Sequence, residues 1–155
     1  MRRHEQHEIG WYDLETTEHG RRDPVLGVLG ERAPVFQWHG RTYDLPAGAA
    51  QLARTATCEQ QAFRFGSNAY GFQFHLEVDA PLIERWLSLP AYREELASAG
   101  IGASEENIRA ATRELIARTQ SLAEATFNNF LDLIGRPNRR VALPSRGMPA
   151  WAGEH

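Results

Sequence analysis

The pattern of apolar and polar residues changes near residue 79 and divides the chain into a strand-rich and a helical region. From Glu8 to Val78, β-branched and aromatic residues are broken at short intervals by Gly, Pro and Asp. This pattern predicts five short strands, and their spacing is too short for repeated crossover helices. The sheet is therefore expected to be antiparallel or mixed. The expected strands are Ile9 to Thr16, Pro34 to Trp38, Gln51 to Thr55, Gln61 to Phe65 and Ala69 to His75.

From Asp79 onward the apolar residues recur at three- and four-residue spacing, which is typical of amphipathic helices. Asp79 is a suitable N-cap and Pro81 falls in the first turn of the helix that follows. A second short helix is expected over Ala91 to Ala99. Ser104 then caps a long helix that keeps this spacing up to Gly135. Together these patterns predict a helical region packed against the sheet.

The domain limits follow from the same patterns. We expect one domain over residues 1–135, strand-rich over 8–78 and helical over 79–135. The stretch 136–155 contains Pro137, Pro144 and Pro149 and little periodic apolar content. Such a composition cannot bury enough apolar surface to order itself, so this tail is expected to be disordered.

Composition narrows the functional classes. The net charge is −3, which gives no support to a nucleic-acid-binding role. A single cysteine, Cys58, excludes an internal disulfide framework and suits a reducing compartment. No apolar run is long enough for a membrane span, and no apolar segment follows the charged start as in a signal peptide. The sequence therefore predicts a cytoplasmic protein.

A histidine and a carboxylate lie two residues apart at the end of the last expected strand, in Gln73-Phe74-His75-Leu76-Glu77-Val78. Successive side chains of a strand alternate faces, so His75 and Glu77 are expected on one side of it. A carboxylate beside an imidazole accepts the Nδ1 proton and leaves Nε2 free as a base. The pair predicts two of the three members of a nucleophile–base–orienter triad.

Four separated segments carry further motifs: Glu8 to Tyr12 (EIGWY), Val35 to Gly40 (VFQWHG), Gln61 to Gly66 (QAFRFG) and Ala69 to Val78 (AYGFQFHLEV). In order and spacing they resemble the class I (triad-type) glutamine amidotransferases, above all stand-alone members similar to the glutaminase domain of GMP synthase. The resemblance covers about residues 8–89. It implies an α/β fold, namely a partial flavodoxin-like amidotransferase domain with a mixed β-sheet region followed by C-terminal helices.

The resemblance also implies an activity. Family members hydrolyse the side-chain amide of glutamine through a cysteine thioester and deliver ammonia to a partner reaction, whereas some relatives cleave γ-glutamyl bonds. By resemblance, His75 is the general base and acid and Glu77 is its orienting partner. His39 is a candidate substrate-binding residue, with a structural histidine as the alternative. Arg41 stands where the family motif has an aspartate, which leaves its role open.

The family's nucleophile, a cysteine in a G-x-C-x-G elbow, has no counterpart in this sequence. Cys58 lacks the flanking glycines of such an elbow, so we interpret it as an ordinary, partly buried thiol. Because losing a triad nucleophile lowers turnover by a factor on the order of 10⁶, the chain alone is expected to be inactive. We expect a fragment of a longer protein, whose uncovered sheet edge binds a complementary N-terminal segment or a second copy.

Three other interpretations stay open. The first is a γ-glutamyl peptide hydrolase of the same fold, and the second is a non-catalytic binding or regulatory remnant. The third is a metal site formed by His39, His75 and Glu77, which have the ligand types of a facial-triad iron centre. No cofactor follows from the sequence.

Overall fold

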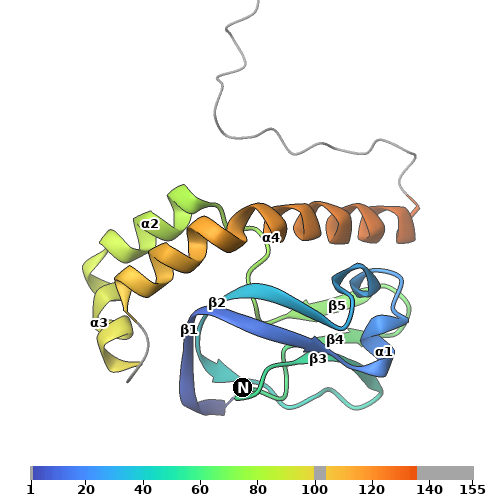
Figure 1. Ribbon diagram of the computed structural model, residues 1–155. Coiled ribbons are helices and arrows are strands. Elements are labelled where there is room, and N and C mark those ends of the chain that lie inside the picture. The colour runs from blue at the N-terminus through green and yellow to red at the C-terminus, as the bar shows by residue number, and fades with distance from the viewer. Residues whose placement is uncertain (1, 100–103, 136–155) are drawn as a thin grey trace, which may run out of the picture.

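The protein is described by a computed structural model over residues 2–99 and 104–135, in which helices lie against a curled sheet (Figure 1). The strands are β1 (Arg2–Thr16), β2 (Arg32–Thr42), β3 (Ala49–Arg54), β4 (Ala62–Phe65) and β5 (Ala69–Phe72). The helices are α1 (Glu18–Arg21), the short 3₁₀ turn η1 (Leu26–Leu29), α2 (Ala80–Ser88), α3 (Pro90–Ser98) and α4 (Glu105–Leu133). The predicted order of a strand-rich region followed by a helical one is confirmed.

The five strands form one sheet in the order β2-β1-β3-β4-β5, and every pairing between these described strands is antiparallel. This resolves the choice between an antiparallel and a mixed sheet. The sheet curls, because the chain after β5 returns to β2 at the opposite edge. There the backbone N–H of His75 donates to the carbonyl of Phe36 at 2.8 Å, in an isolated antiparallel bridge. The predicted triad segment therefore lies against β2.

The five predicted strands are all present, but each has at least one limit that differs from the prediction, and β2 continues to Thr42, beyond the predicted Trp38. β1 begins at Arg2, before the predicted Ile9, and β5 ends at Phe72, before the predicted His75. The chain bends over residues 73–74 and His75 pairs with β2, so it does not continue the β4–β5 hairpin. The hairpin itself is confirmed, with Gly66 at a φ of +63°, a conformation that glycine adopts without steric strain.

Two clusters of buried apolar side chains hold the helices to the sheet. One lies between the sheet, η1 and the second half of α4, and includes Leu14, Leu52 and Phe74. The other joins β1 and β2 to α2, α3 and the first half of α4. Its buried members are Ile9, Phe36, Val78, Ile83, Leu87, Leu96 and Ile108. Figure 1 shows α4 lying along one face of the sheet, with α2 and α3 beside its first half.

The buried face of α4 contains threonines beside its apolar side chains. Thr112, Thr119 and Thr126 are all buried. Thr119 donates from Oγ1 to the carbonyl of Pro34 at 3.3 Å, and Thr112 accepts from Nε1 of Trp11 at 2.9 Å. Buried hydroxyls are tolerated when they are hydrogen-bonded, so these two contacts allow α4 to lie on the sheet.

All three predicted helices are present, with the middle one at Pro90–Ser98, and both predicted N-caps are confirmed. The Asp79 carboxylate accepts from the backbone N–H of Leu82 at 2.8 Å, and the Ser104 hydroxyl accepts from that of Asn107 at 3.1 Å. The tail over 136–155, expected to be disordered, lies outside the described residues. Among the described helices, none is long and apolar enough to cross a membrane.

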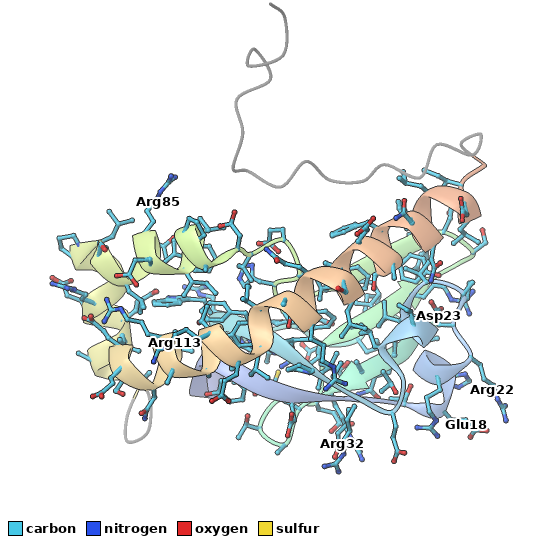
Figure 2. The ribbon with its side chains drawn as sticks, turned by 45° about the horizontal axis from the view of Figure 1, so that its top comes forward. Glu18, Arg22, Asp23, Arg32, Arg85 and Arg113 are labelled. Atoms are coloured by element: carbon cyan, nitrogen blue, oxygen red, sulfur yellow. The ribbon has the colours of Figure 1, made fainter. Side chains whose placement is uncertain are left out.

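A buried carboxylate ties η1 to the β4–β5 hairpin. Asp23, labelled in Figure 2, accepts from the backbone N–H groups of Val25 at 2.9 Å and Leu26 at 3.0 Å. Its other oxygen lies 3.0 Å from Nε of Arg64 and 3.3 Å from the hydroxyl of Tyr70. This network therefore stabilises the end of the sheet that lies away from His75. The end near His75 packs against α2 and α3.

Candidate active site

The structure brings together the two residues of the predicted triad. Nδ1 of His75 lies 2.6 Å from Oε1 of Glu77, and the two side chains are 28% and 55% exposed. Phe74, Leu76 and Val78 are buried on the opposite face of the same segment. The alternation expected of an extended segment is therefore present, although His75 forms only a single β-bridge.

The imidazole of His75 is held on two sides. Its backbone is fixed by the bridge to Phe36, and its ring packs edge-on against the indole of Trp86 in α2, with centroids 5.2 Å apart. Trp86 in turn stacks on Tyr92 of α3 at 5.7 Å. Aromatic pairs of this kind stabilise one relative orientation of the rings. Helices α2 and α3 thus set the plane of the histidine.

The electrostatics of the pair favour a charged carboxylate. Partial burial opposes ionisation of Glu77, but the hydrogen bond and charge of His75, with backbone N–H groups, lower the pKa of this carboxyl below its usual value. A carboxylate accepts only, so it selects the tautomer that carries the proton on Nδ1. Nε2 then presents a lone pair from a part-exposed ring, as a general base requires.

His39 lies in a different environment, in β2 and within a buried polar cluster. Its Nε2 lies 2.8 Å from Oε2 of Glu8, its Nδ1 lies 3.1 Å from the carbonyl of Arg41, and its side chain is 9% exposed. These contacts support the structural alternative, and substrate binding by His39 stays a prediction. The side chain of Arg41 is exposed, while its carbonyl also accepts from Gln73 Nε2 at 2.5 Å.

The proposed metal set of His39, His75 and Glu77 does not assemble. Within residues 2–99 and 104–135, the group of possible ligand atoms that lie within 4.8 Å of one another is Glu8, His39 and Cys58. Cys58 is buried beside Thr42, whose Oγ1 lies 3.4 Å from the cysteine Sγ. The structure therefore groups Cys58 with Glu8 and His39, and not with His75 and Glu77.

Glu8 is the polar residue whose importance the sequence did not reveal. It is fully buried and lies directly opposite His39 in the β1–β2 register. Its carboxylate accepts from the hydroxyls of Thr55 and Thr57 and, at 2.6 Å, from Nε2 of Gln61. Burial opposes its ionisation, but the hydrogen bonds of His39, Thr55 and Thr57 and the charge of His39 lower the pKa of Glu8 below the usual value. An acidic residue at an inward position of an apolar strand is a signal that could have indicated this network.

Comparisons with known proteins agree with the motifs. A curated protein of Salmonella typhimurium, YfeJ, which is provisionally named glutamine amidotransferase-like, is 35% identical over 77 residues. A solved glutamine amidotransferase from Thermotoga maritima is 30% identical with a TM-score of 0.71 over 84% of this chain. One from Methylobacillus flagellatus is 26% identical with a TM-score of 0.76 over 88% of this chain. The chain resembles the class I glutamine amidotransferases in sequence and in fold. No family model matches the chain.

The amidotransferase-like chain is shorter than these relatives. It spans 32% of the length of the curated protein, and 54% and 57% of the two solved chains. Because this chain spans only part of the longer relatives, an activity, a substrate or a partner is stated for it below as a proposal.

Proposed function

We propose that this chain supplies the histidine and the carboxylate of a Cys–His–Glu triad that hydrolyses the side-chain amide of glutamine. The observation that carries the proposal is the 2.6 Å contact between Nδ1 of His75 and Oε1 of Glu77 on a part-exposed face. The amidotransferase-like sequence and fold support it.

In this mechanism, Nε2 of His75 takes the proton from a cysteine thiol as the sulfur attacks the amide carbon of glutamine. The imidazolium that forms is stabilised by the charged Glu77, whose lowered pKa keeps it ionised. His75 then returns the proton to the leaving ammonia. Water hydrolyses the thioester by the reverse proton path and yields glutamate. Backbone N–H groups near the nucleophile would form the oxyanion hole.

The nucleophile comes from another polypeptide segment in this proposal. Cys58 is buried and grouped with Glu8 and His39, so its sulfur is not presented to His75. The complementary segment would carry a cysteine elbow and pack beside the His75–Glu77 face. The cytoplasm is the expected location, and an ammonia-accepting enzyme is the expected partner.

The proposal is tested by expressing the gene product together with the in-frame sequence upstream of Met1, beside the 155-residue chain alone. Glutamate and ammonia release are measured with glutamine and, separately, with γ-glutamyl peptides. We expect glutaminase activity only when a cysteine elbow is present. Preferential cleavage of γ-glutamyl peptides would assign the alternative hydrolase. No activity with either substrate, in a folded protein that contains the elbow, would reject the triad and favour a binding role.

A further inference from the structure

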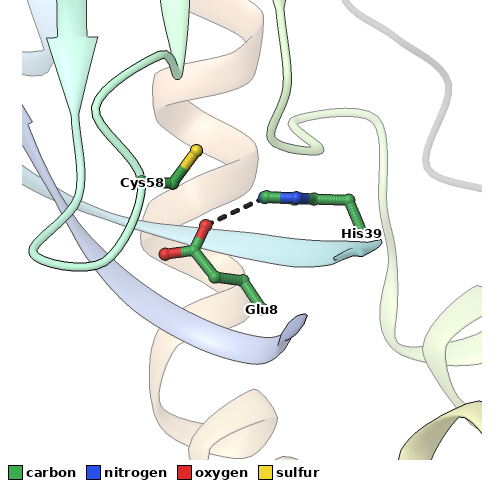
Figure 3. A group of neighbouring side chains, drawn as sticks. All are labelled: Glu8, His39 and Cys58. Carbon is green, nitrogen blue, oxygen red and sulfur yellow. Dashed lines mark ion pairs between the residues drawn. The ribbon is translucent and has the colours of Figure 1, made fainter. Parts of the chain in front are cut away.

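The buried pair of His39 and Glu8 has a cysteine beside it, Cys58, whereas the structure groups no cysteine with His75 and Glu77 in the described part of the chain. Glu8 of β1, His39 of β2 and Cys58 of the β3–β4 loop meet with their ligand atoms all within 4.8 Å of one another (Figure 3). Glu8 and Cys58 are fully buried, and His39 is nearly so. Thiolate, imidazole and carboxylate are the three ligand types that zinc takes in proteins. We propose that Glu8, His39 and Cys58 bind one divalent transition-metal ion with the ligand preferences of zinc.

The surroundings of His39 favour this assignment. Nδ1 faces the carbonyl of Arg41 at 3.1 Å, so a proton on Nδ1 has an acceptor and Nε2 faces Glu8. Histidines that bind a metal through one ring nitrogen usually donate from the other to a carbonyl or carboxylate. The ring is therefore already oriented as a ligand by its contact with β2.

The surroundings of Glu8 and Cys58 are suitable as well. Thr55 and Thr57 hold Oε1 of Glu8, while Oε2 faces His39 and also accepts from Gln61 at 2.6 Å. Within the described part of the chain, Sγ of Cys58 lies 3.4 Å from Oγ1 of Thr42 and 3.7 Å from the carbonyl of Gln60. Both carboxylate oxygens are thus held in place by donors, Oε2 also faces the histidine, and the sulfur makes only the weak hydrogen bonds of a thiol.

The charges balance when a metal enters. A divalent ion displaces the proton of the Cys58 thiol and is bound by Nε2 of a neutral His39 imidazole, so the ligand set carries one thiolate and one carboxylate. The ion, the thiolate and the carboxylate then sum to zero. Burial of a neutral set avoids the large penalty of an isolated buried charge.

A fourth ligand completes the tetrahedral coordination of zinc, and a water molecule suits this position. The hydroxyl of Tyr43 is buried and has no hydrogen-bond partner in the described part of the chain, and Tyr43 directly follows Thr42, whose Oγ1 lies 3.4 Å from Sγ of Cys58. A buried phenol oxygen normally has a partner. It can hydrogen-bond to such a water beside the metal. Because the three ligands join β1, β2 and the β3–β4 loop, the ion would stabilise this end of the sheet.

The test titrates the chelator-treated chain with Co²⁺, whose visible and near-ultraviolet bands report tetrahedral geometry and thiolate ligation, and then with Zn²⁺ in competition. Cys58→Ser and His39→Gln are each expected to weaken binding by at least about a hundredfold, the upper end of the effect of losing an outer-shell partner. His75→Gln is the matched control at the exposed pair and is expected to leave binding unchanged. Equal affinity in Cys58→Ser, or loss in His75→Gln, would overturn the proposal.

A second measurement applies if the variants fail to fold. X-ray absorption at the zinc edge of the wild-type chain is expected to show one sulfur at about 2.3 Å and nitrogen or oxygen ligands at about 2.0–2.1 Å. A spectrum without sulfur would reject Cys58 as a ligand. A chain that binds no Zn²⁺ at all would reject the site. Neither result bears on the triad of the glutaminase proposal, which uses His75 and Glu77.

Discussion

The chain contains two histidine–carboxylate pairs that look alike in distance and differ in environment. His75 and Glu77 lie 2.6 Å apart on one part-exposed segment, while His39 and Glu8 lie 2.8 Å apart across two strands inside the fold. Glu77 has His75 as its side-chain partner, whereas Glu8 also accepts from two threonines and a glutamine. The same pair of functional groups is therefore placed once at the surface and once in a closed network.

The difference shows that burial and partners separate the roles that a histidine can take. A base needs an accessible ring nitrogen and a carboxylate that can stabilise the imidazolium, which the His75 pair offers. The His39 pair directs both ring nitrogens at acceptors within the fold, which suits a structural or metal-binding role. The two pairs are also connected, because the carbonyl of Arg41 accepts from His39 and from Gln73, two residues before His75.

The largest expected effect is on catalysis. In the reconstituted glutaminase, His75→Ala is expected to lower turnover by a factor on the order of 10⁴ to 10⁶, since the base is lost. Its melting temperature should change little because the side chain is part-exposed. Steady-state ammonia release measures the effect, and His19→Ala, an exposed histidine on α1, is the matched control. Turnover that survives His75→Ala would end the base assignment.

The next largest effect is on the free energy of unfolding, where the buried pair matters more than the exposed pair. In metal-free protein, Glu8→Ala is expected to lower the free energy of unfolding by about 3–5 kcal/mol, because buried donors lose their acceptor. Glu77→Ala at the exposed pair should lower it by less than about 1 kcal/mol. Urea denaturation compares the two. If Glu8→Ala does not fold, Thr57→Val removes one donor and is expected to lose about 1 kcal/mol. Equal losses in Glu8→Ala and Glu77→Ala would contradict the comparison.

Much of the fold follows from local signals in the sequence. The five strands, the Gly66 turn and the caps at Asp79 and Ser104 depend on neighbouring residues, so they are readable in the chain. The curl of the sheet is not, because the bridge between Phe36 and His75 joins residues far apart in sequence. That contact ends β5 at Phe72, which the apolar pattern alone extends to His75.

Of the candidate site, the sequence likewise predicts the local part and not the part that depends on long-range packing. The two-residue spacing places His75 and Glu77 on one face, and the structure has them in contact. The Glu8 network was not foreseen, because its partners come from three separate segments and only the strand register opposes Glu8 to His39. The grouping of Cys58 with this pair, and not with His75 and Glu77, depends on the same long-range packing.

In metal-free protein, acid should remove the stability that the buried Glu8 carboxylate provides. The folded-state pKa of Glu8 is below its ordinary value of 4.5, so its stabilisation is fully present above that value. The stabilisation is lost as pH falls through the lower folded-state pKa, because the folded chain must then take up a proton. Melting temperatures across this acid range should fall more steeply for wild type than for Glu8→Gln. Parallel curves would show that Glu8 is not the group responsible.

The smallest expected change in stability is that of Glu77→Gln, and this variant tests directly what sets the tautomer of His75. Glu77→Gln keeps the size of the side chain but removes the charge, and we expect less than about 1 kcal/mol of lost stability. The neutral amide can donate as well as accept, so it no longer selects the tautomer with the proton on Nδ1 of His75. Nitrogen-15 chemical shifts of the His75 ring should therefore move toward a mixture of tautomers, while those of His39 stay unchanged. An unchanged His75 tautomer in Glu77→Gln would show that the Trp86 contact and the Phe36 bridge, and not the carboxylate, set the state of the ring.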